Sequence, residues 1–109
     1  MSADPERDVP PGAAVFPLIP AELGIDPLLL AILHAVVFVE GSEEDVVHPD
    51  AAEEALEHFA GYLQRLSGPK LVRVREDLDC LAAYARQQEW PKAQARFVRE
   101  FLTTYGIDG

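Results

Sequence analysis

A second cysteine is missing from this sequence, in which Cys80 is the one thiol among 109 residues. A lone cysteine forms no internal disulfide, so the fold must rely on its core and an oxidising compartment is not implied. A long apolar run is missing too, because residues 28–39 fall well short of the about 20 that a membrane span needs. The first residues lack the basic and then apolar pattern of a secretion signal. We therefore expect a cytoplasmic protein.

Positive charge is also scarce. The chain has 9 lysines and arginines against 19 aspartates and glutamates, for a formal net charge of -10. Residues 1–58 contain a single base, Arg7, while the other bases follow residue 58. Because an excess of negative charge repels phosphate groups, we expect no binding to nucleic acid and none to an anionic membrane.

The first twenty residues show no helical periodicity. Residues 1–15 are mostly proline, glycine, alanine and charged residues, so we predict a disordered tail there and a single helical domain over 16–109. Pro17 and Pro20 exclude a helix from the next segment. Its apolar residues Phe16, Leu18 and Ile19 nevertheless predict a proline-rich strap that packs onto the domain.

Four prolines stand where helices should begin, because proline favours the first helical position. They are Pro27, Pro49, Pro69 and Pro91, and Asp26 precedes the first as a good N-cap. Apolar residues recur every three or four positions after each proline. The sequence predicts an all-α four-helix bundle, with helices at about 26–40, 49–66, 69–89 and 91–105. We expect Gly41 to end the first helix in a left-handed conformation.

The first predicted helix differs from the others. The later three carry one apolar stripe each, with Tyr62 in the first of these stripes and Phe101 in the last. Between residues 28 and 39, by contrast, only His34 is polar. We favour a central helix buried on all sides. The alternative is that part of it forms a dimer or partner interface, since exposed apolar patches mark binding sites.

Acidic residues gather on both sides of the second helix start. Glu43, Glu44 and Asp45 are consecutive in a loop, and Glu53 and Glu57 lie one turn apart on the helix. We favour a solvated face whose charges complement the helix dipole. The functional alternative is that these five residues form a docking surface for a protein partner, because clustered charge steers association with a surface of opposite sign.

Residues with catalytic or metal-binding chemistry are few. Cys80 falls mid-helix beside acidic residues, where a thiol is ordinary rather than reactive. Glu54 and His58 are four apart on one helix, and His34 stands alone among apolar residues. No cofactor and no metal is therefore expected. A helical metal-binding protein or enzyme that uses His34, or Glu54 with His58, remains an alternative.

One segment resembles a known family. The tripeptide His48-Pro49-Asp50 and the residues after it resemble the signature tripeptide and third helix of J-domain co-chaperones; those residues are Ala52-Glu53-Glu54, Tyr62, Leu66-Ser67 and Pro69. In that family the tripeptide stimulates the ATPase of a partner chaperone, so the resemblance implies a co-chaperone role. The family has a basic helix before the tripeptide, whereas residues 40–47 are acidic here.

No nucleotide-binding loop or catalytic signature stands out in the sequence. The apolar first helix and the uneven charge are its distinctive features. We therefore predict a small non-enzymatic helical protein-interaction module or accessory subunit, with a protein partner or as a homodimer. The co-chaperone and the metal-binding or enzymatic roles are the alternatives.

Overall fold

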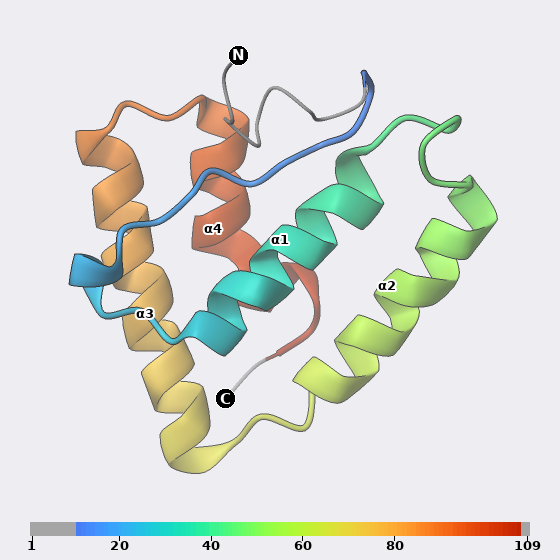
Figure 1. Cartoon of the computed structure of the whole chain (residues 1–109). Helices are drawn as coiled ribbons and strands as arrows, with labels where there is room; N and C mark the ends of the chain where they lie inside the picture. Colours follow the sequence, from blue (N-terminus) through green and yellow to red (C-terminus); the bar gives the residue numbers. More distant parts are fainter. Residues whose placement is uncertain (1–10, 108–109) are drawn as a thin grey trace.

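The computed structural model describes residues 11–107, and every regular element in that range is helical (Figure 1). This confirms the predicted all-α fold. A short 3₁₀ turn, η2 (Ala21–Leu23), precedes the four helices α1 (Pro27–Gly41), α2 (Pro49–Leu63), α3 (Gly68–Gln87) and α4 (Lys92–Thr104).

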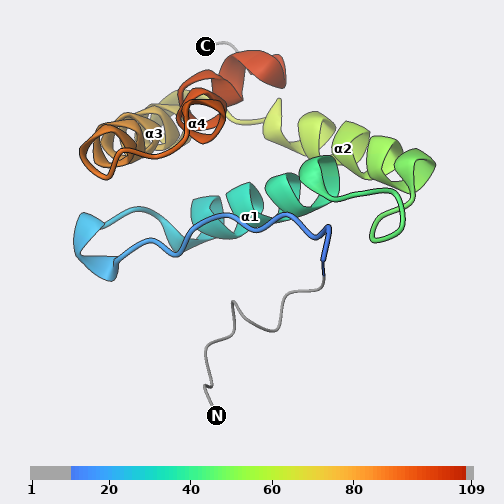
Figure 2. The same ribbon diagram turned by 90° about the horizontal axis from the view of Figure 1, so that it is seen from above.

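The helices form two antiparallel pairs. The closest backbone packing joins α1 to α2 and α3 to α4. Seen from above, α1 lies with the N-terminal strap in one layer, and the other three helices form the second (Figure 2). Short connections make the partners within each pair antiparallel, as in other helix bundles.

Local chemistry at the predicted starts explains where the helices begin. Pro27 opens α1, and the Asp26 side chain accepts a hydrogen bond from the Leu28 N–H at 2.8 Å. Pro49 opens α2 in the same way. At α4 the prediction is one residue early, because Pro91 is the N-cap and the helix begins at Lys92.

The predicted end of α2 at residue 66 is too late by three residues. After Leu63 the Arg65 and Leu66 N–H groups each donate to the carbonyl three residues earlier, at 3.0 Å. Bonds of this spacing tighten the chain into turns and stop the α-helix.

The end of α3 has a different cause. Glu89 has a φ of 54°, in the left-handed region, and the Trp90 N–H donates to the Ala85 carbonyl at 3.0 Å. This closes α3 at Gln87, two residues before the predicted end. A left-handed residue with this bond is a common helix end, although glycine usually occupies the position.

Gly41 does not have the predicted left-handed conformation. It is the last residue of α1, and Ser42 continues with a φ of -77°. A Cβ at Gly41 would lie 2.9 Å from the Ala14 side chain, closer than atoms approach in proteins. Glycine is therefore required here because the strap passes close to the helix.

The strap begins earlier than predicted. The Gly12 carbonyl accepts from the Glu43 N–H at 2.8 Å, and the Ala14 N–H donates to the Ser42 hydroxyl at 2.9 Å. Residues 11–15, predicted as part of the tail, thus lie against the loop after α1. The rest of the predicted tail, residues 1–10, lies outside the described residues.

Phe16 anchors the strap in the core. Its side chain is fully buried, and its ring meets the rings of His34 at 5.5 Å and Trp90 at 5.6 Å between centroids, both edge-on. Ile19 packs against the core, as predicted. Leu18 does not, because it is 71% exposed.

The core is built mainly from side chains of α1, α3 and α4. Helices α3 and α4 supply most of the buried side chains, and α1 adds one stripe, Leu29, Leu33 and Val36. The favoured prediction that α1 is buried on all sides is therefore wrong. Helix α2 has no fully buried residue, and Tyr62 of its predicted core stripe is 63% exposed.

The contrast between Phe16 and Leu18 gives a test of the strap. Replacing Phe16 by Ala is expected to lower the free energy of unfolding by about 3–5 kcal/mol, because a filled site in the core becomes a cavity. Leu18→Ala removes a similar apolar side chain from solvent and should change it by less than about 0.5 kcal/mol. Urea unfolding of both variants measures the difference. Equal losses would show that Phe16 does not anchor the strap.

Candidate functional site

An open groove with apolar walls lies between the start of α1, the end of α2 and the start of α3. Its volume is about 460 Å³. The apolar lining, which defines the apolar groove below, comes from all four helices and the turn after α2; it consists of Leu28, Leu29, Ile32, Leu63, Leu66, Pro69, Val74 and Phe101. Leu28 is 76% exposed. Large exposed apolar surface of this kind is typical of binding sites.

Three charged residues stand at the groove: Asp26, Lys70 and Arg73. Two of them are engaged in the fold. Asp26 caps α1, and Arg73 donates to the Gly24 carbonyl and to Asp77, each at 2.9 Å. Lys70 is exposed on the first turns of α3, so its ammonium is the charge that a bound molecule would meet.

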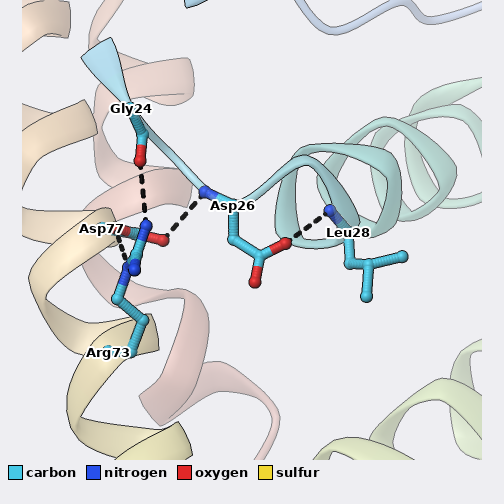
Figure 3. Close-up of polar contacts among 5 residues, drawn as sticks. All are labelled: Gly24, Asp26, Leu28, Arg73 and Asp77. Carbon is cyan, nitrogen blue, oxygen red and sulfur yellow. Dashed lines mark hydrogen bonds and ion pairs between the residues drawn. The ribbon is translucent and has the colours of Figure 1, made fainter.

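A buried carboxylate positions the wall of this groove (Figure 3). Asp77, only 6% exposed, accepts from the Asp26 N–H at 3.0 Å with one oxygen and from the Arg73 Nε with the other. The hydrogen bond and the charge of Asp77 raise the pKa of Arg73. Because buried charges need such partners, these contacts fix where α1 begins relative to α3.

Asp77 is one of the acidic residues beside Cys80, and its burial was not predicted from the sequence. A signal for its burial was present, since Asp77 comes three residues after Val74 and one before Leu78, on the apolar side of α3. An acid in such a stripe needs a partner, and Arg73 is one helical turn earlier. The other donor, the Asp26 N–H, is 51 positions away and has no sequence signal.

The five predicted docking residues lie around the end of the molecule where α1 is joined to α2. All five are exposed. Glu44 and Glu53 meet, together with Glu40, around a hollow of about 320 Å³ that we call the acidic hollow. Its other lining residues are mostly apolar: Val39, Ser42, Val47, Pro49, Ala52 and Leu56.

The remaining three predicted docking residues do not line this hollow. Glu43 lies beside the strap, because a Cβ on Gly12 would be 2.8 Å from its carboxylate. Asp45 is on the exposed loop, and Glu57 follows Glu53 by one turn of α2. The structure thus brings together two of the five, and whether any of them contacts a partner remains a prediction.

Glu40 also ties α1 to the end of α4. The Tyr105 hydroxyl donates to a Glu40 carboxylate oxygen at 3.3 Å. Burial, and then the charge and hydrogen bond of Glu40, raise the pKa of Tyr105 to about 12. All three causes favour the neutral phenol.

A second charged hollow, of opposite sign, lies between the end of α3 and the start of α4. Its volume is about 490 Å³. Four cations and one acid line it around Trp90 and two alanines; the charged residues are Arg86, Glu89, Lys92, Arg96 and Arg99. We call it the cationic hollow. The sequence did not predict this hollow, because its bases come together only through the turn at Glu89.

Among the candidate residues for chemistry, His48 has a local structural role in capping a helix, and three others are exposed. His48 caps α2, with its Nδ1 accepting from the Asp50 N–H at 3.1 Å. Glu54, His58 and Cys80 are exposed. The described part of the chain contains no group of three or more His, Cys, Asp or Glu side chains placed to hold a metal ion.

Comparison of the chain with known proteins gives no relative: no family model, no curated protein and no solved structure matches it. Within residues 11–107, no helix combines the length and the apolar character that crossing a lipid bilayer requires.

The Asp77 contacts predict a graded loss of stability. Asp77→Ala should lower the free energy of unfolding by about 2–3 kcal/mol, because the Asp26 N–H and the Arg73 guanidinium lose a charged acceptor. Asp77→Asn keeps one acceptor oxygen and should cost less. Asp79→Ala, at an exposed acid on the same helix, is the control and should stay within about 0.5 kcal/mol. Thermal and urea unfolding rank the three, and a loss for Asp79→Ala equal to that for Asp77→Ala would contradict the assignment.

The Tyr105 pKa predicts a loss of stability in alkali. In the folded protein the pKa of Tyr105 is about 12, above the 10.0 of a tyrosine in water. The stabilisation is therefore fully present below pH 10 and is lost as the pH rises through 12, because the unfolded chain ionises first. Unfolding free energies between pH 9 and 12 should fall less steeply in Tyr105→Phe than in the wild type. Tyr62→Phe, at an exposed tyrosine, should keep the wild-type slope; if Tyr105→Phe keeps it too, the prediction is wrong.

Proposed function

We propose that the protein is a small non-enzymatic interaction module, and that its apolar groove binds an amphipathic helix of a protein partner. The observation that carries the proposal is the groove itself, which leaves Leu28 exposed at the start of a helix that is apolar on most sides. A groove with apolar walls is the usual receptor for the apolar face of a helix.

The charges define the chemistry of the partner segment. Asp26 and Arg73 are held by contacts within the fold, so Lys70 is the charge open to a ligand. The bound helix should therefore present apolar side chains to Leu28, Ile32 and Leu66 and a carboxylate to Lys70.

The remaining parts of the proposal follow from composition. The net charge of -10 argues against nucleic acid and anionic lipid as ligands. The single cysteine fits a cytoplasmic protein. A co-chaperone role through His48-Pro49-Asp50 is not favoured by a specific contact, because His48 is engaged in capping α2.

Two exposed leucines provide a matched test. Leu28 lines the groove and Leu18 does not, and both are largely exposed. A photo-crosslinking residue placed at position 28 in the source cell should trap a partner that is not trapped from position 18. With that partner purified, Leu28→Ser should weaken binding by about tenfold or more, as truncation of an interface anchor does.

The control is Leu18→Ser, which should leave both binding and the thermal midpoint unchanged. Lys70→Glu should weaken binding further if the partner presents a carboxylate, and the effect should shrink at high salt. Equal binding by the Leu28 and Leu18 variants would show that the groove is not the interface.

A further inference from the structure

Repulsion among the cations of the cationic hollow destabilises an isolated chain. Lys92 and Arg96 are four apart on α4 and Arg99 follows three later, so like charges neighbour one another on one face. Lys92 also sits in the first turn of α4, where the helix dipole disfavours a cation and where the helix has no acidic residue.

These cations are not neutralised within the fold. Among residues 11–107 no ion pair involves Arg86, Lys92, Arg96 or Arg99, although acids outnumber bases about two to one in the chain. The other residues that line the hollow are Trp90, Ala85 and Ala95. Apolar lining residues surrounded by cations can bind an anionic group that projects from an apolar surface.

The acidic hollow has the complementary composition. Glu44 and Glu53 line it together with mostly apolar residues. It lies where α1 joins α2, and the cationic hollow lies where α3 joins α4. Figure 1 places these two connections at the same end of the molecule, and Figure 2, which looks onto that end, shows them on opposite sides of it.

We propose that the cationic hollow binds the acidic hollow of a second copy of this chain. Because both hollows lie at one end of the molecule, a twofold axis can pass between them. The acidic hollow of each copy then faces the cationic hollow of the other, and these two reciprocal contacts close the dimer. The apolar groove lies toward the other end, where α2 leads into α3 (Figure 1), so this dimer is a surface additional to the proposed partner site and does not depend on it.

Such a dimer should depend strongly on salt. Its contacts are charge pairs at the surface, and the screening length falls from about 10 Å at 0.1 M salt to about 3 Å at 1 M. Sedimentation of the wild-type protein should show a dimer at low salt that dissociates at high salt. A monomer at low salt, at the highest concentration the protein reaches, overturns the proposal.

A charge exchange tests which surfaces meet. The base-reversed variant Arg96→Glu with Arg99→Glu and the acid-reversed variant Glu44→Lys with Glu53→Lys should each remain monomeric, because each places like charges opposite one another. Mixed one to one, they should form a heterodimer, since both reciprocal contacts are then between opposite charges. The expected change is about tenfold or more in the dissociation constant, and failure of the mixture to associate contradicts the arrangement.

Two controls separate this result from other causes. Arg65→Glu with Lys70→Glu changes the net charge as much as the base-reversed variant does, yet lies outside the cationic hollow, and should leave the dimer intact. Circular dichroism and thermal midpoints check that each variant is folded. If the wild type stays monomeric and instead binds inorganic phosphate, with loss in the base-reversed variant, the hollow is a small-anion site and the dimer is wrong.

Discussion

The buried carboxylate of Asp77 is the contact on which the arrangement of the two helix pairs depends. It lies in the middle of α3 and holds the backbone just before α1, while Arg73 clamps the Gly24 carbonyl beside it. A buried charge is tolerated only with such partners, so α1 can start in only one place relative to α3. With its start fixed, α1 turns Leu29, Leu33 and Val36 inward and leaves Leu28 at the groove.

The open surfaces of the protein follow from this arrangement. A helix that is apolar on most sides needs more cover than three helices and a strap provide, so its first turn and part of α2 remain half covered. The two charged hollows lie at the end opposite the apolar groove, where α1 is connected to α2 and α3 is connected to α4. Apolar and electrostatic surfaces are therefore separated along the molecule, which allows two different contacts to coexist.

Features that depend on neighbouring residues could be predicted from the sequence, whereas features that depend on contacts between distant residues could not. Helix starts were predictable because proline and Asp26 act on the adjoining turn. The role of Gly41 was not, because it depends on Ala14, which reaches the helix only in the folded chain. The burial of Asp77 depends on an N–H group in another element, and the cationic hollow depends on a turn at Glu89, where a non-glycine residue is left-handed.

The path of the strap has a consequence for synthesis on the ribosome. Phe16 emerges long before two of its ring partners, Trp90 and Phe97, which follow it by more than 70 positions in the chain. Contacts so far apart along the chain form late in folding. The nascent chain therefore carries an uncovered Phe16 and an apolar α1 until α4 has left the exit tunnel, which is when a chaperone or an early partner has access to them.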